Sequence, residues 1–265
     1  MDERNGSGMI MIDSLCCRSR LRDKNAGVKS AFALITLVIC IAARSFPVSA
    51  VVFVTNGVLT VWKGKIPASS YVRLLLVPAA FLLAGMAVII VNISDVPMDA
   101  FAIPAGRWYL TGSRHAVLEA LELGGAAMAS VTCLYFLALN TSVTDILGVL
   151  RALHCPSLLT ELMMLIYRFI FLLMETASAL MTAQEARLGN RNLRTGLRSF
   201  GMMGTALFLR SLKRANALYD AMEARCYDGE IRVLARKQPA EAGDILLTVL
   251  FEAALTGVMI WSRIR

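Results

Sequence analysis

AQEARL at residues 183–188 and AMEARC at residues 221–226 are two copies of one pattern, Ala-x-Glu-Ala-Arg-x. Each copy closes a long segment of helix-forming residues, and a glycine follows within three residues. The repeat therefore predicts two long helices that end in Arg187 and Arg225. The last turn of a helix carries the negative end of the helix dipole, which favours a cation there.

A guanidinium on a helix end keeps five donors for an acidic pocket on another molecule. Two such ends in one chain suggest contact with two copies, or two halves, of one partner. The alternative is that the two matches reflect composition alone, because alanine, glutamate and arginine are all good helix formers.

The composition indicates an all-α integral membrane protein. Of 265 residues, 57% are hydrophobic and only 17% are charged, whereas soluble domains average about 25% charged. In a membrane protein a net charge of +8 is typical of basic cytoplasmic loops. The six cysteines form no CxxC pair and no spaced set with histidine, so we expect no disulfide framework and no zinc site. We also expect no other bound metal and no cofactor.

Hydropathy and charge together predict about five transmembrane helices plus cytoplasmic coupling helices. Uncharged runs mark the predicted spans at 30–43, 45–62, 74–94, 123–144 and 244–262. The basic residues before the first run place the N-terminus in the cytoplasm. The predicted organisation is a cytoplasmic tail (1–29), a four-span region (30–144), a cytoplasmic coupling-helix module with two Ala-Arg-x ends (145–238), and a C-terminal transmembrane helix (239–265).

The apolar segment 157–188 is predicted to lie along the cytoplasmic face instead of crossing the membrane. Its charged residues Glu161, Arg168 and Glu175 are spaced by seven and share one helical stripe. Each would cost roughly 2.5–3.5 kcal/mol near the membrane centre. Crossing would also put the basic residues after Arg187 outside. The alternative is a span that pairs its charges inside the bundle.

Glu252 interrupts the last predicted span. A carboxylate there is expected to face the bundle interior and to accept a hydrogen bond from a neighbour. Together with Glu161, Arg168 and Glu175 it is a candidate coupling or packing residue.

The stretches LIYRFIFLLMETASALMTAQEARLG (165–189) and RSLKRANALYDAMEARCYDGEIRVL (210–234) resemble the transmembrane T component of energy-coupling-factor (ECF) transporters. The resemblance is strongest to the cobalt-type member, CbiQ. It covers roughly residues 120–235 well and the first spans only in layout. Nickel and vitamin systems share the plan.

The resemblance implies a subunit of the prokaryotic inner membrane that couples a substrate-binding membrane subunit to two cytoplasmic ABC-type ATPases. Its two ends would dock in grooves on the ATPases, and the residues implied are Ala186, Arg187, Leu188, Ala224, Arg225 and Cys226. The family often has Gly or Ser at the third position, so Leu188 and Cys226 depart from its pattern. The implied substrate is cobalt, with nickel or a vitamin as alternatives.

The residues themselves offer no catalytic site. No GxxxxGK[ST] phosphate loop occurs, and no acid, base and nucleophile cluster in the sequence. We therefore expect a non-catalytic subunit that binds no nucleic acid. Two other readings remain: a membrane enzyme acting on lipid, for which only Glu252 and the 161/168/175 stripe are available, and an anchor whose basic face holds anionic lipid.

Overall fold

The computed structural model describes residues 15–16, 19–90, 92–94, 101–105, 108–112, 114–229, 231 and 241–264. These residues divide into two compact units. Helices α2–α5 and α9 belong to one unit, helices α7 and α8 to the other, and the boundary falls within α6. The predicted module of 145–238 overlaps the α7–α8 unit, and its cytoplasmic position stays a prediction.

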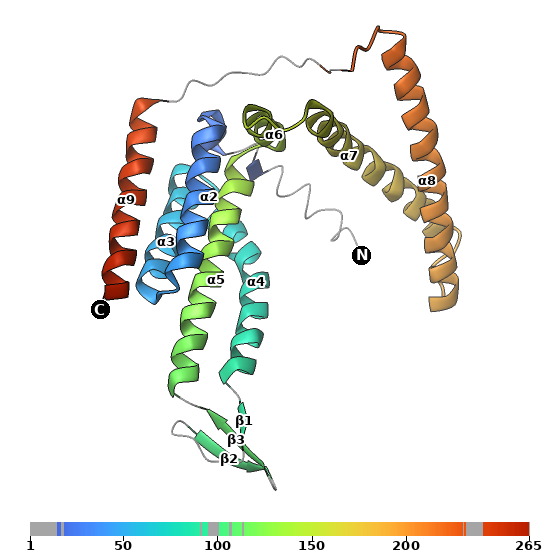
Figure 1. Cartoon of the computed structure of the whole chain (residues 1–265). Coiled ribbons are helices and arrows are strands. Elements are labelled where there is room, and N and C mark those ends of the chain that lie inside the picture. Colours follow the sequence, from blue (N-terminus) through green and yellow to red (C-terminus); the bar gives the residue numbers. More distant parts are fainter. Residues whose placement is uncertain are drawn as a thin grey trace. The chain divides into compact units, whose positions relative to one another are not determined.

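The first unit is a bundle of membrane-type helices (Figure 1). Its elements are η1 (Arg20–Asp23), α2 (Ala26–Ala43), α3 (Phe46–Val58) with its π-helical extension η2 (Leu59–Lys63), α4 (Ala68–Ile90), α5 (Arg114–Asn140) and α9 (Ala242–Ile264). Helix α6 (Val143–Ala152) follows α5. Helices α7 (Ser157–Ala186) and α8 (Leu193–Glu223) form the second unit.

Helix α5 is the centre of the bundle. It packs against α2, α3 and α4, and α9 packs against α2 (Figure 1). Most of its buried residues have another buried residue three or four positions away, which is the period of one helix face, and most are small: Ala120, Gly124, Ala126, Ala129, Thr132, Cys133, Phe136, Leu139 and Asn140. Small side chains let helix backbones approach closely. Inside a membrane such packing holds helices together, because the hydrophobic effect does not favour protein contacts over lipid contacts there.

A polar network closes one end of this bundle. The buried Asn140 accepts a 2.7 Å hydrogen bond from Ser19 Oγ at its Oδ1. Lys29 Nζ donates to the carbonyl oxygens of Asn140 (2.8 Å) and Leu21 (2.9 Å). These bonds hold the segment before α2 against the end of α5, so buried polar groups find partners inside the protein.

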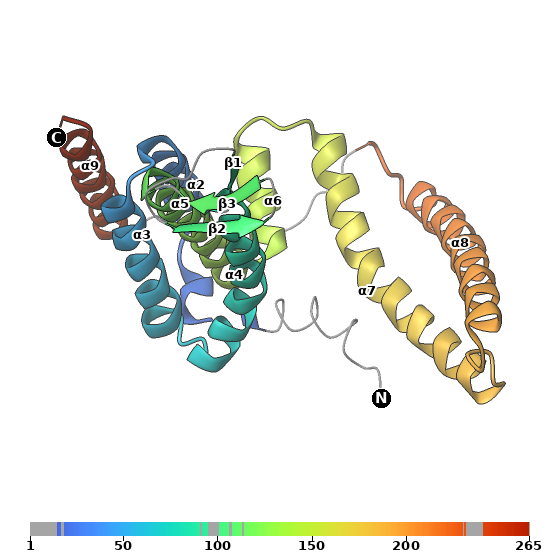
Figure 2. The ribbon, with the colours of Figure 1, turned by 90° about the horizontal axis from the view of Figure 1, so that it is seen from below.

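Between α4 and α5 the chain forms a small antiparallel sheet with strand order β1-β3-β2 (Figure 2). The strands are β1 (Asn92–Ser94), β2 (Phe101–Ala105) and β3 (Trp108–Gly112). Aromatic and β-branched residues such as Trp108, Tyr109 and Thr111 favour strands. The sheet is an addition to a fold that is otherwise helical in the described residues.

Six helices in the described part of the chain are long and apolar enough to cross a membrane, judged by length and composition. Five of them, α2, α3 with η2, α4, α5 and α9, overlap the five predicted spans, which confirms the predicted all-α integral membrane protein. Helices α4 and α5 each end four residues before the predicted spans of 74–94 and 123–144 do. The sixth is α7. Length and composition alone do not place α7 inside or outside the bilayer, so its position along the membrane face stays a prediction.

The helix boundaries after α5 follow local capping signals. Ser142 caps α6: its Oγ accepts from the Asp145 backbone N–H at 3.2 Å and donates to the Asp145 carboxylate at 2.6 Å. Pro156 immediately precedes α7. The sequence of residues 189–197 predicts a basic turn, with the second long helix starting near residue 198. Helix α8 instead starts at Leu193, five residues earlier, so this turn is shorter than predicted.

Candidate functional site

The first Ala-Arg-x end is a helix terminus of the Schellman type. The backbone N–H of Gly189 donates to the carbonyl oxygen of Gln184 at 2.8 Å, and the N–H of Leu188 donates to that of Glu185 at 3.0 Å. Leu188 adopts the left-handed conformation, with φ of 57°. This pair of bonds with one left-handed residue defines the motif and satisfies carbonyl groups that would otherwise be free.

The second end repeats the same geometry. The N–H of Tyr227 donates to the carbonyl oxygen of Met222 at 3.1 Å, and the N–H of Cys226 donates to that of Glu223 at 3.0 Å. Cys226 is left-handed, with φ of 58°. In both copies the arginine therefore occupies the last position before the left-handed residue, so the sequence repeat is also a repeat in three dimensions.

The left-handed conformation restricts which residue can follow each arginine without strain. A glycine adopts this conformation without penalty, whereas other residues carry a cost of roughly 1–2 kcal/mol from the contact between Cβ and carbonyl oxygen. Leu188 and Cys226 therefore hold a strained backbone conformation at the two ends. Leucine at the first end is also 69% exposed, so its side chain gains little from burial in this chain.

Both guanidinium groups are available to another molecule. Arg187 and Arg225 are exposed, as are Ala186 and Ala224 beside them. Within the described ranges neither arginine forms an ion pair. The ends lie near opposite ends of α8, whose 31 residues span about 45 Å at 1.5 Å per residue.

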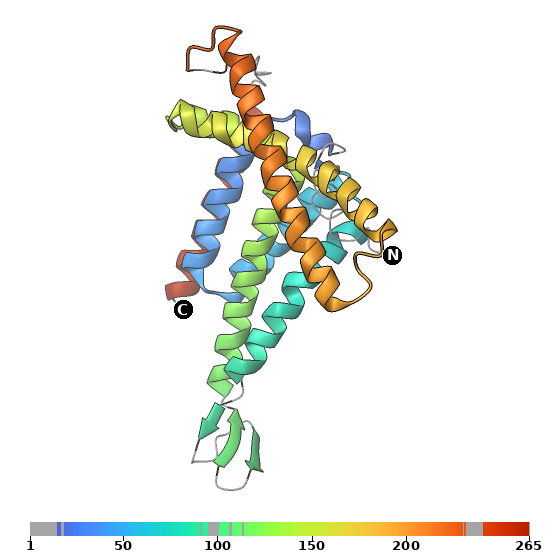
Figure 3. The same ribbon diagram turned by 90° about the vertical axis from the view of Figure 1, so that its right-hand side faces the viewer.

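The two long helices are tied at the turn that joins them. Gln184 Nε2 donates to the carbonyl oxygen of Ser199 at 2.9 Å, and Ser199 Oγ donates to the carbonyl oxygen of Gly189 at 2.9 Å. Ser199 is buried there. The first arginine end is thus fixed to the first turns of α8, and Figure 3 shows the two helices crossing.

At the other end of this unit, Glu161 fastens the chain that follows α8. Its Oε2 accepts from the Tyr227 hydroxyl and its Oε1 accepts from the Ile231 backbone N–H, both at 2.9 Å. Glu161 is 6% exposed. A helix along the membrane face is predicted to turn its charged stripe toward water or a partner. This prediction is wrong for Glu161, because residues 66 and 70 positions later cover it.

The other candidate residues lie apart from the hydrogen bonds of Glu161. Arg168 and Glu175 are exposed on α7. Glu252 on α9 faces inward and accepts a 2.6 Å hydrogen bond from Thr36 Oγ1 on α2. Glu252 belongs to the bundle and the arginine ends belong to the α7–α8 unit, so the candidate residues form no single site.

Two features of the structure are not predicted by the sequence pattern. The Glu161–Tyr227 pair carries no local signal, because its partners are far apart in the sequence. A pocket in the bundle also gathers basic residues from two parts of the chain, among them Arg20 before α2 and Lys63 and Lys65 at the end of η2. The available signal was that basic residues flank the predicted spans on the same face of the membrane.

A known protein family and several curated proteins match most of this chain. The model of the CbiQ cobalt transport protein family matches residues 18–235. The cobalt transport protein CbiQ of Rhodobacter capsulatus is 32% identical over 244 residues, which cover 92% of this chain and 95% of that protein. The putative fused cobalt transport protein CbiMQ of Methanocorpusculum labreanum is 30% identical over 259 residues, 94% of this chain and 42% of that one.

The likeness extends beyond the cobalt proteins. The energy-coupling factor transporter transmembrane protein EcfT of Lactococcus lactis subsp. cremoris is 32% identical over 133 residues, 48% of this chain and 50% of that protein. The helical membrane bundle, the paired arginine ends and these matches lead to one assignment. The chain belongs to the CbiQ family of cobalt transport proteins, the cobalt-type transmembrane components of energy-coupling-factor transporters.

Proposed function

We propose that this chain is the non-catalytic coupling subunit of an ATP-driven cobalt importer. It transmits the motion of two ABC-type ATPase subunits to a substrate-binding membrane subunit. The names of its relatives support cobalt transport and an energy-coupling-factor complex. The observation that carries the coupling role is the pair of matched, exposed arginine ends at opposite ends of α8.

The ends suit docking because each presents a cation in a defined backbone frame. The Schellman bonds fix the direction of the chain at Arg187 and Arg225. An arginine binds a carboxylate through two parallel hydrogen bonds, which transmit position as well as charge. A separation of about 45 Å along α8 requires two receiving sites instead of one.

The hydrogen bonds within the α7–α8 unit supply the stiffness that coupling needs. When the ATPases close on ATP and open after hydrolysis, they carry the two arginine ends with them. The Gln184–Ser199 bond passes the displacement of the first end to α8, and the Glu161–Tyr227 bond passes that of the second end to α7. The crossed helices then change their angle, and the substrate-binding subunit is reoriented.

Coupling requires the α7–α8 unit on the cytoplasmic side, with the N-terminus on the same side. Arg168 and Glu175 are exposed on α7 and would meet lipid if the helix crossed the membrane. Cys226 is exposed, so its labelling reports on which side of the membrane the α7–α8 unit lies. In inverted vesicles a membrane-impermeant maleimide is expected to label Cys226, and in right-side-out vesicles it is not. The Cys226→Ser variant gives the background.

Docking is tested by co-purification with the candidate ABC ATPases. The variant carries Arg187→Glu and Arg225→Glu, and its control carries Arg191→Glu and Arg194→Glu, an equal charge reversal in the same basic region. Loss of the ATPases from the first variant alone is expected. Equal loss from both would mean a diffuse basic patch, and full retention in both would refute docking through these ends.

Substrate is tested by uptake in cells that contain the whole transporter. Labelled cobalt is expected to accumulate in an ATP-dependent manner, and nickel and vitamins are not. Preferential uptake of nickel or of a vitamin would keep the coupling role and reject the cobalt assignment. We place recognition of the ion on the partner subunit, since among the described residues no three His, Cys, Asp or Glu side chains cluster.

A further inference from the structure

A pocket of about 620 Å³ lies at the end of the bundle where α2 and α9 begin and η2 ends. All of its walls belong to the bundle unit. These three helix termini are also the ends of three candidate membrane spans. The pocket therefore lies at the level where a bilayer passes from hydrocarbon to headgroups.

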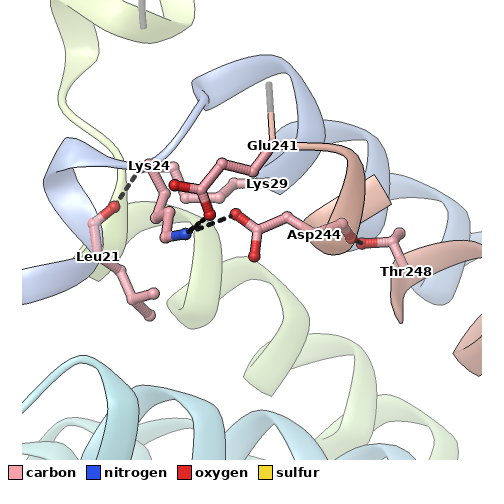
Figure 4. A network of polar contacts seen from close by, with 6 residues as sticks. All are labelled: Leu21, Lys24, Lys29, Glu241, Asp244 and Thr248. Carbon is pink, nitrogen blue, oxygen red and sulfur yellow. Dashed lines mark hydrogen bonds and ion pairs between the residues drawn. The ribbon is translucent and has the colours of Figure 1, made fainter. Parts of the chain in front are cut away.

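Cations dominate its charge. The basic residues that line it are Arg20, Lys24, Lys29, Lys63 and Lys65, and Asp244 is the one acidic residue among the lining side chains. Two of the cations are engaged within the protein. Lys24 pairs with Glu241 and Asp244 (Figure 4), and Lys29 donates to two backbone carbonyls.

Three cations remain for an external anion. Arg20, Lys63 and Lys65 are exposed and make no ion pair in the part of the chain that the structure describes. They come from two segments, one before α2 and one at the end of η2. The pocket thus gathers positive charge that nothing within the described residues neutralises.

The walls become mostly apolar as they enter the bundle, with Thr55 and Thr248 as polar exceptions. On α2 the order is Lys29 then Phe32, and on η2 and α3 it is Lys63 then Leu59. Helix α9 passes from Asp244 through Leu247 to Phe251, and Phe136 of α5 also lines the pocket. A rise of about 1.5 Å per residue puts the aromatic rings one to two turns below the charges.

The rim of the pocket carries Trp62, whose side chain is 82% exposed. An exposed indole is typical of the membrane interface, where its ring lies among headgroups. A small phosphate would use the cations alone and leave the apolar walls unpartnered. An amphiphile with an anionic head uses both parts.

We propose that this pocket binds one anionic phospholipid. The phosphate faces Arg20, Lys63 and Lys65, and the glycerol and first acyl carbons lie along Phe32 and Phe251. Basic pockets between membrane helices suit such headgroups. The site is separate from the arginine ends and does not depend on the proposed coupling role.

Native mass spectrometry of the purified full chain, titrated with phosphatidylglycerol, tests the site. The variant is Lys63→Gln with Lys65→Gln. Its control is Arg44→Gln with Arg73→Gln, which removes two exposed cations of the same unit that do not line the pocket. The expected loss is roughly 10- to 30-fold in the first variant and under about twofold in the control, because each basic residue near an anionic lipid contributes about a fivefold factor.

Two further arms separate a lipid from a soluble phosphate. Glycerol phosphate is expected not to compete with phosphatidylglycerol, and phosphatidylcholine is expected to bind at least tenfold more weakly. The Leu247→Trp variant narrows the apolar wall without changing charge and is expected to block the lipid. Equal loss in both charge variants, effective competition by glycerol phosphate, or unchanged binding in Leu247→Trp would each overturn the proposal.

Discussion

Removal of the Glu161 carboxylate is the sharpest test of how the α7–α8 unit is held together. Glu161→Ala deletes the acceptor of two 2.9 Å hydrogen bonds, from the Tyr227 hydroxyl and from the Ile231 backbone N–H. Both donors lie within six residues after Arg225, in the chain that follows the second arginine end. The substitution is therefore expected to release Tyr227 and Ile231 from the start of α7 while both long helices remain.

The magnitude follows from these contacts. A hydrogen bond to a charged acceptor contributes about 1.5–3 kcal/mol net of water. Tyr227 is half-buried and both donors reach water once released, so the lower value applies to each bond. The two together are expected to lower the free energy of local opening by about 3 kcal/mol, a factor of roughly one hundred in the opening equilibrium.

Amide hydrogen exchange measures this opening, since exchange of a protected N–H follows the population of the open state. The Ile231 amide is expected to exchange about one hundred times faster in Glu161→Ala. Tyr227→Phe removes only one of the two bonds and is expected to give an increase of about tenfold. Glu175→Ala removes the same charge from an exposed position of α7 and serves as the control.

Two results would refute the reasoning. If the Ile231 amide exchanges at the same rate with and without Glu161, the carboxylate does not hold this segment. If Glu175→Ala accelerates exchange as much as Glu161→Ala, the effect belongs to net charge on α7 and not to the two hydrogen bonds. Glu161→Gln, which keeps an acceptor without the charge, is expected to lie between wild type and alanine.

Three further predictions concern strain, charge and burial. Leu188→Gly and Cys226→Gly should each raise the free energy of unfolding by up to about 1 kcal/mol, and with it the thermal midpoint, because glycine adopts a positive φ without strain. An unchanged or lower midpoint would count against strain at these positions. The hydrogen bonds that Lys24 donates to Glu241 and then to Asp244 raise its pKa above 10.5, and a raised pKa contributes stability that is lost as pH rises through it. The difference in midpoint between wild type and Lys24→Met should therefore be constant from pH 7 to 9 and shrink only above 10.5; a decline near pH 8 would contradict this. Thr36→Val leaves the inward-facing Glu252 without its donor and should cost about 1–3 kcal/mol in thermal unfolding, whereas adding Glu252→Leu should recover much of the loss; equal stability of wild type and Thr36→Val would refute it.

Much of the fold could be predicted because its signals are local. Uncharged runs marked the membrane helices, and α2, α3 with η2, α4, α5 and α9 overlap those runs. Helix boundaries were less accurate, as the early start of α8 at Leu193 shows. Its first turn is basic and exposed, so the hydrophobic pattern begins only after it.

The small sheet of β1, β2 and β3 was not predicted. Its strands are three to five residues long, and pairing such short strands depends on neighbours that hydropathy does not identify. The location of Arg168 and Glu175 on one stripe followed from spacing alone. Which members of that stripe are covered did not, because covering requires a segment from elsewhere in the chain.

The sequence by itself determined the membrane helices and the two arginine ends, because hydropathy, helix propensity and terminating residues act over neighbouring positions. Tertiary structure decided the burial of Glu161 by Tyr227 and Ile231, and it assembled a basic pocket from the ends of three helices. Both depend on residues between about 40 and 220 positions apart, and their proximity is set by the packing of whole helices instead of by local pattern.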